Sequence, residues 1–246
     1  HGIDSIPSKK LWHDKSNELK IYDNKEIFLN KDKFIEMLKS FYEYGYVIIE
    51  NTKPEENEVI NFAEKIGPVR TTNWGKLFNV ISKPNPNDLA YTALELKSHS
   101  DNPYRKPVPG IQLLHCIANE SIGGDSSLVD GYSVSKYLEN NYKEYFKVLT
   151  ETNVNFKFTD VDVILENKSK IIELDTEGNF KQISFSGRLD YVPLLENKKL
   201  DTFYNARKLM YELCNSDKFK IYDSKKLFLL SLGWPITNIF ILFLIM

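Results

Sequence analysis

The chain of 246 residues carries 32 lysine and arginine side chains against 34 aspartates and glutamates, which gives a formal net charge of -2. This balance supplies neither the basic surface of a nucleic-acid-binding protein nor the positive field that attracts an anionic membrane. A small-molecule partner is therefore expected, and the length fits one domain with a sizeable core.

Cysteine content and the first residues indicate the compartment. Cys116 and Cys214 are too few for a disulfide framework and lack the C-x-x-C spacing of zinc or redox sites. The chain begins at His1, and its opening HGIDSIPSKKLWHDK has no apolar run of the signal-peptide type. These features predict a cytoplasmic protein without a membrane partner, and they leave a homodimer open.

The first predicted elements are a helix, a strand and a second helix. Asn30 is a candidate N-cap and Gly45 a candidate end for a helix whose apolar residues recur at helical spacing, namely Phe34, Met37, Leu38 and Phe41. The following YVIIE reads as a buried strand. A second amphipathic segment, PEENEVINFAEKIG, ends at Gly67.

From Leu77 onward, short extended runs alternate with turn residues. The runs are LFNVIS, AYTALEL, GIQLLHCI, SSLVDG, VNFKF, IIELD and KQISFSG. Two helical segments interrupt them, SVSKYLENNYKEYFKVLTET with Ser133 as its candidate cap, and TFYNARKLMYELCNS. The succession predicts a sandwich or barrel decorated with helices, an α+β fold.

The tripeptide His99-Ser100-Asp101 is the candidate metal-binding motif. Residues i and i+2 of an extended segment project to the same side, so the imidazole and the carboxylate could hold one metal together. Non-haem Fe(II) in oxygenases is held by two histidines and one carboxylate on one face. A hydrogen-bonded structural pair is the alternative, because this short pattern also arises by accident.

The surrounding run from Asn87 to Val134 resembles gamma-butyrobetaine hydroxylases, within the broader family that includes taurine dioxygenase. It reads NDLAYTALELKSHSDNPYRKPVPGIQLLHCIANESIGGDSSLVDGYSV, and the resemblance extends over nearly all residues before about Tyr222. It implies a double-stranded β-helix (jelly-roll) core with flanking helices. It also implies an Fe(II)- and 2-oxoglutarate-dependent dioxygenase, with dioxygen as the second cosubstrate.

The resemblance also assigns roles to individual residues. His99 and Asp101 would be catalytic iron ligands, and Ser126, in the Gly-Gly-Asp-Ser turn, would bind the 2-oxoglutarate carboxylate. A turn hydroxyl bonded to its own backbone is the alternative for Ser126. His115, in an apolar LLHC run, is interpreted as a core histidine rather than a ligand.

A quaternary ammonium group cannot donate hydrogen bonds, so proteins select it with aromatic faces, each contributing roughly 0.5 to 2 kcal/mol. By the same resemblance, Trp74, Phe78 and Tyr91 match an aromatic cage, and Asp88 matches a polar position near the ammonium. Core packing is the alternative for the aromatic residues, and a loop position for Asp88. The implied reaction is hydroxylation of gamma-butyrobetaine to L-carnitine, with trimethyllysine dioxygenase as the alternative.

The two ends of the chain depart from the family pattern. None of the four histidines lies in the C-terminal third, where the distal iron ligand and an arginine are expected, and the chain there reads DSKKLFLLSLGWPITNIFILFLIM. We therefore expect three parts. Residues 1–15 would be a remnant of a linker from an absent N-terminal domain. Residues 16–222 would form an incomplete oxygenase jelly roll lacking its last core strands, and residues 223–246 an aberrant apolar tail caused by truncation or frameshift.

Other interpretations of the apolar end and of the whole chain remain open. A membrane anchor or a diverged strand would also explain the apolar residues. A chain without the distal histidine could be a catalytically inactive binding protein or fragment.

Overall fold

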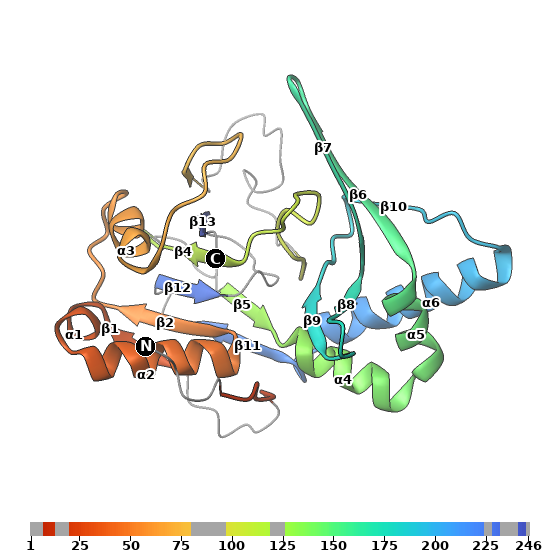
Figure 1. The fold of residues 1–246 in the computed structure, drawn as a ribbon, viewed down its shortest axis with the longest axis horizontal. Coiled ribbons are helices and arrows are strands. Elements are labelled where there is room, and N and C mark those ends of the chain that lie inside the picture. Colours follow the sequence, from red (N-terminus) through yellow and green to blue (C-terminus); the bar gives the residue numbers. More distant parts are fainter. Residues whose placement is uncertain are drawn as a thin grey trace.

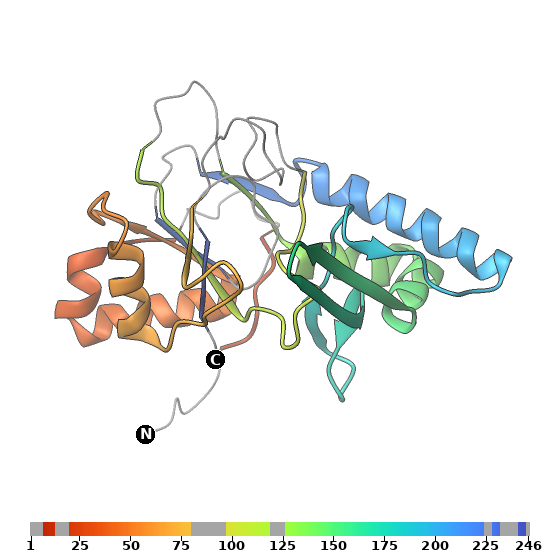
Figure 2. The same cartoon turned by 90° about the horizontal axis from the view of Figure 1, so that it is seen from above.

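The structure is a computed structural model that describes residues 7–12, 20–79, 97–118, 126–223, 228–231 and 241–244. A six-stranded sheet with three N-terminal helices forms one half of the molecule, and a helical cluster with smaller sheets forms the other (Figure 1). Seen from above, the two halves lie side by side (Figure 2). The expected strand at residues 90–96 lies outside the described residues.

The six-stranded sheet has the order β1-β2-β12-β4-β13-β3. β1 pairs with β2 in parallel, and every other pairing in this sheet is antiparallel. The strands of this sheet are β1 Ile21–Asp23, β2 Tyr46–Glu50, β12 Phe228–Ser231, β4 Ile111–Leu114, β13 Ile241–Leu244 and β3 Leu77–Phe78.

Three helices pack against this sheet: α1 (Asn24–Leu29), α2 (Lys31–Tyr44) and α3 (Glu58–Ile66). The predicted cap of α2 is confirmed, because the Asn30 side chain accepts hydrogen bonds from two backbone N–H groups of the first turn. Gly45 then ends the helix at a φ of 78°, a conformation that glycine adopts without steric cost.

Successive side chains of β2 point to opposite faces of the sheet, and both faces are buried. Val47 and Ile49 join the core beneath the helices, whereas Tyr46 and Ile48 belong to a second cluster on the opposite face. The helix-side core also contains Ile27, Met37, Phe41, Val59, Phe62, Ala63, Ile111 and Leu113.

The other half contains three helices, α4 (Gly131–Asn141), α5 (Lys143–Glu151) and α6 (Asn197–Asn215). In this half, a three-stranded sheet runs in the order β10-β6-β7, and a two-stranded sheet pairs β8 with β9. A further pair, β11 with β5, lies next to the six-stranded sheet (Figure 1), where Leu128 of β5 packs with Tyr46 and Ile48 of β2. These strands are β5 Ser126–Val129, β6 Asn153–Asp160, β7 Val163–Lys170, β8 Ile172–Leu174, β9 Phe180–Ile183, β10 Asp190–Tyr191 and β11 Lys220–Asp223. The β6–β7 hairpin projects from the body of the molecule (Figure 1).

Three details of this half differ from the prediction. The helix expected from Ser133 begins at Gly131, because the buried Asp130 carboxylate accepts the Ser133 N–H at 2.9 Å and is the cap. The helical run is also split, since Tyr142 at a φ of -139° separates α4 from α5. Strand β7 was not predicted.

The apolar end of the chain contributes two strands to the six-stranded sheet. β12 lies between β2 and β4, and β13 lies between β4 and β3. The structure thus places residues 228–231 and 241–244 in this sheet, and the expected division of the chain into three parts stays a prediction. Among the described residues, no helix has the length and apolar character that a membrane crossing requires.

Candidate active site

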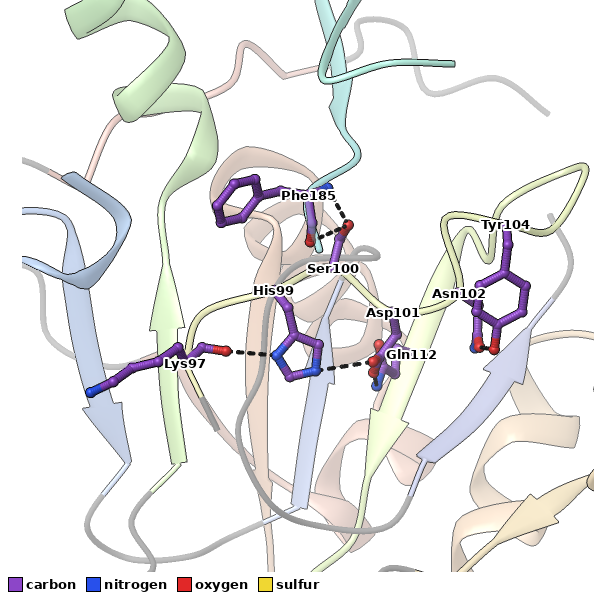
Figure 3. A network of polar contacts seen from close by, with 8 residues as sticks. All are labelled: Lys97, His99, Ser100, Asp101, Asn102, Tyr104, Gln112 and Phe185. Carbon is purple, nitrogen blue, oxygen red and sulfur yellow. Dashed lines mark hydrogen bonds and ion pairs between the residues drawn. The ribbon is translucent and has the colours of Figure 1, made fainter. Parts of the chain in front are cut away.

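The segment Lys97–Asn102 carries the candidate metal ligands, and three anchors fix it in place. Ser98 Oγ donates to the carbonyl of Cys214 on α6 at 3.0 Å. The Ser100 backbone N–H donates to the Phe185 carbonyl at 2.7 Å, and Ser100 Oγ accepts the Phe185 N–H at 2.7 Å. Ser100 therefore points toward Phe185, while its two neighbours point away from it and toward each other (Figure 3).

His99 and Asp101 meet on the opposite side of this segment. Their facing atoms, His99 Nε2 and Asp101 Oδ1, lie 3.3 Å apart, and the two side chains are 16% and 17% exposed. His99 Nδ1 lies 2.7 Å from the Lys97 carbonyl oxygen (Figure 3). When Nδ1 carries the proton, it donates to that carbonyl oxygen. The lone pair of Nε2 then points toward Asp101.

The second oxygen of Asp101 is held by β4. Gln112 is fully buried on this strand, and its Nε2 donates to Asp101 Oδ2 at 2.6 Å. Each candidate ligand thus has one atom fixed by the protein and one atom directed to its neighbour. Hydrogen bonds of this kind, made to the outer atoms of histidine and carboxylate ligands, orient such ligands around a metal.

Burial and the neighbouring carboxylate act in opposite directions on the pKa of His99. Burial lowers the pKa of the imidazole, but the hydrogen bond and negative charge of Asp101 outweigh burial, so the pKa of His99 is raised above its ordinary value. The carboxylate of Asp101 therefore favours the protonated form of this ring.

These residues match two of the three protein positions of a non-haem iron site. An imidazole nitrogen and a carboxylate oxygen are donors that suit Fe(II), and they converge here. Within the described ranges, no group of three His, Cys, Asp or Glu side chains could hold a metal. His115 is 2% exposed just after β4, and burial lowers its pKa, as expected for a core histidine.

Two cavities border the candidate ligands. Asp101 and Ser100 line one of about 180 Å³, together with Trp12, Tyr46 and Asp130. His99 lines a larger one of about 670 Å³ on the side of α6. The candidate metal-binding motif therefore borders both cavities.

The predicted cage residues Trp74 and Phe78 lie together, with ring centroids 5.4 Å apart. Phe158 packs on Trp74 at 5.3 Å, and the Arg105 guanidinium lies 5.4 Å from the Trp74 ring centroid. A cation therefore already occupies one Trp74 face. Neither cage residue lines the two cavities beside His99 and Asp101.

The remaining predicted site residues are not placed. Asp88 and Tyr91 lie outside the described residues, as does the side chain of Ser126, whose backbone begins β5.

Gln112 was not among the predicted site residues, although its place in an apolar run of the sequence indicates a buried polar contact. It is the one polar residue of β4, whose residues Ile111–Leu114 are all buried. Buried side-chain amides require hydrogen-bond partners, so a glutamine at such a position indicates a polar neighbour.

Comparisons with known proteins identify the family of the chain. Residues 18–222 match the model of the taurine catabolism dioxygenase TauD, TfdA family. The chain is 31% identical over 219 residues to the gamma-butyrobetaine dioxygenase of Homo sapiens, covering 87% of this chain and 56% of that protein. It is 27% identical over 194 residues to the trimethyllysine dioxygenase of Meyerozyma guilliermondii, covering 75% and 49%. The chain thus spans about half the length of the curated relatives it matches.

Solved structures share the fold. A putative alpha-ketoglutarate-dependent taurine dioxygenase from Burkholderia xenovorans superposes with a TM-score of 0.63 at 11% identity, covering 95% of this chain and 84% of that one. AAD-2 in complex with Mn(II) and N-oxalylglycine gives 0.63 at 12% identity, covering 96% and 90%. The expected α+β class with a jelly-roll core is confirmed, and the chain belongs to the TauD, TfdA family.

Proposed function

We propose that this chain is a domain of an Fe(II)- and 2-oxoglutarate-dependent dioxygenase, in which His99 and Asp101 hold the metal. The observation that carries the proposal is the 3.3 Å approach of His99 Nε2 to Asp101 Oδ1 on a segment anchored from three directions. Family membership supports it, because the matched family is described as one of dioxygenases.

The proposed substrate carries a trimethylammonium group, with gamma-butyrobetaine first and trimethyllysine as the alternative. Relatives at about 30% identity are named as dioxygenases of these two compounds. The Trp74 and Phe78 pair supplies aromatic faces of the kind that attract such a cation. Tyr91 and Asp88 complete the proposed recognition site.

Within this proposal, the chain's own residues orient and tune the ligands. The Lys97 carbonyl fixes the imidazole, the Gln112 amide fixes the carboxylate, and Ser126 would bind a carboxylate of 2-oxoglutarate. Loss of the His99 proton frees Nε2 for coordination. When bound, Fe(II) supplies the oxidation of a substrate C–H bond by dioxygen, coupled to the conversion of 2-oxoglutarate to succinate and carbon dioxide.

Succinate release and metal binding test the proposal together. The full chain is incubated with Fe(II), ascorbate, 2-oxoglutarate and either gamma-butyrobetaine or trimethyllysine, and Mn(II) binding is followed separately by electron paramagnetic resonance. We expect gamma-butyrobetaine to stimulate succinate release, and Asp101→Asn to abolish both signals. Asp162→Asn, an exposed residue of the β6–β7 turn, is the matched control.

The possible results separate the competing interpretations. Stimulation by trimethyllysine alone would select the alternative substrate. Mn(II) binding that depends on Asp101 without turnover would indicate a binding protein, the reading favoured by the lack of histidine in the C-terminal third. Mn(II) binding equal in wild type and Asp101→Asn would refute the assignment of the site.

A further inference from the structure

A buried arginine lies against Trp74, one of the residues of the proposed recognition site. The Arg105 guanidinium is 5.4 Å from the Trp74 ring centroid and 5.7 Å from the Tyr104 ring centroid. Phe158 joins these two rings, edge-on to Trp74 at 5.3 Å and stacked on Tyr104 at 5.0 Å. Arg105 is only 8% exposed. Trp74, Tyr104 and Phe158 therefore form an aromatic site that already holds a cation.

Arg105 lacks the carboxylate partner that usually accompanies a buried cation. Its Nη2 donates to Oδ1 of Asn73, which is a neutral and exposed side chain. Its Nε is buried and has no hydrogen-bond partner in the described part of the chain. Among the same residues, no aspartate or glutamate pairs with the guanidinium. Since buried charges are usually paired, this one is held mainly by the aromatic rings.

A second arginine of the chain is anchored far more firmly. Arg207 binds the Asp190 carboxylate with its Nη2 at 2.6 Å and its Nε at 2.7 Å, and the Asp190 side chain is 6% exposed. Arg105 has no such pair. Burial lowers the pKa of Arg105, and the positive charge of Arg70 acts in the same direction. The surroundings of Arg105 therefore stabilise its charged form less than those of Arg207 do.

The backbone around Arg105 is fixed, so its side chain can move alone. The Arg105 N–H donates to the Asn102 carbonyl at 3.0 Å and closes a turn. The carbonyl of Pro103 accepts from Asn167 Nδ2 of β7 at 3.0 Å. Nη2 already reaches the exposed Asn73, so a change of side-chain rotamer suffices to bring the guanidinium into water. Such a change leaves the turn intact and uncovers the aromatic site.

We propose that Arg105 occupies the aromatic site in the absence of a ligand and that a quaternary ammonium group displaces it when it binds Trp74. The inference deepens the proposed function and rests on it for the chemical class of the ligand. Phe78 and Phe158 also pack on Trp74, and like charges repel, so the two cations compete for the same ring. The apparent affinity of the ligand then falls with the fraction of molecules in which Arg105 is docked.

Chemical modification of the full chain tests the displacement itself. Phenylglyoxal reacts with accessible guanidinium groups, and peptide mass spectrometry gives a separate rate for each arginine. We expect Arg105 to react slowly in the free chain and at least about fivefold faster with saturating tetramethylammonium, because the undocked fraction rises. Arg207, which Asp190 holds, is the internal control and should stay slow in both conditions. Equal rates for Arg105 with and without bound tetramethylammonium would overturn the inference.

Removal of the competing charge tests its effect on affinity. Calorimetry measures tetramethylammonium binding to wild type, Arg105→Met, Arg105→Gln and Arg105→Lys. We expect the two neutral variants to bind at least about fivefold more tightly than wild type. Arg105→Lys keeps a cation and should stay closer to wild type. Lys199→Met, which removes an exposed cation of α6, is the matched control and should stay within about twofold of wild type.

The results separate a failure of this inference from a failure of the proposed function. Equal tetramethylammonium affinities in wild type and in folded Arg105→Met and Arg105→Gln would overturn the inference and leave recognition of the ammonium group intact. No binding to any of these forms would overturn the inference together with the proposed class of substrate. In that case, the assignment of His99 and Asp101 would still be decided by the separate Mn(II) measurement.

Discussion

Replacement of Ser100 by alanine tests how the metal-binding motif is held. The Ser100 hydroxyl is buried, with the residue 4% exposed, and it accepts the Phe185 N–H at 2.7 Å while donating to the Phe185 carbonyl at 3.2 Å. Alanine removes the acceptor and leaves a buried amide N–H without it. The Phe185 carbonyl keeps the backbone N–H of residue 100, so the segment can stay docked.

The expected loss of stability comes from the Phe185 N–H, which loses its acceptor. A buried polar group left without its partner costs about 1–3 kcal/mol. For a chain of this size, a loss of about 2 kcal/mol lowers the melting temperature by about 4–8 °C. We also expect weaker Mn(II) binding, because the same segment positions His99 and Asp101.

Urea and thermal denaturation followed by circular dichroism measure the effect. Ser169→Ala is the matched control, since the Ser169 hydroxyl is also buried but has no hydrogen-bond partner in the described part of the chain. Its removal should change the free energy of unfolding by less than about 0.5 kcal/mol. Equal stabilities of Ser100→Ala and Ser169→Ala would refute the reasoning.

Three further predictions concern the surroundings of the site. Gln112→Leu should raise the dissociation constant for Mn(II) about 10- to 100-fold by releasing Asp101, measured by electron paramagnetic resonance; unchanged affinity would contradict the role of β4. Burial raises the pKa of the Cys214 thiol to about 12, so iodoacetamide at pH 8 should modify the partly exposed Cys116 and spare Cys214 until denaturant is added, as read by peptide mass spectrometry. Asp130→Ala removes the cap of α4 and should lower the free energy of unfolding by about 1–2 kcal/mol in urea titration, whereas a change near zero would argue against the cap.

Local signals made part of this structure predictable. The cap at Asn30 and the end at Gly45 depend on a few neighbouring residues, and both are confirmed. The approach of His99 to Asp101 follows from the two-residue period of an extended segment, so the motif could be proposed before its geometry was known.

Long-range contacts could not be predicted in the same way. Gln112 meets Asp101, and Ser100 meets Phe185, only because the fold brings separate segments together. The cap of α4 was misassigned because Asp130 and Ser133 are both good capping residues a turn apart. The C-terminal apolar run has no alternation, and such runs do not distinguish interior strands from other buried segments.

The position of β4 in the six-stranded sheet has a consequence for biosynthesis. Both of its neighbours, β12 and β13, are made long after β4 itself, at the other end of the described chain. During translation, both edges of β4 therefore stay unpaired until β12 and β13 have been made. Unpaired strand edges are prone to pairing with other chains. Since β4 carries the glutamine that holds Asp101, the candidate metal-binding motif lies on a fully paired strand only after β12 and β13 have been made. Chaperone demand from these open edges should therefore last until residues 241–244 have been synthesised.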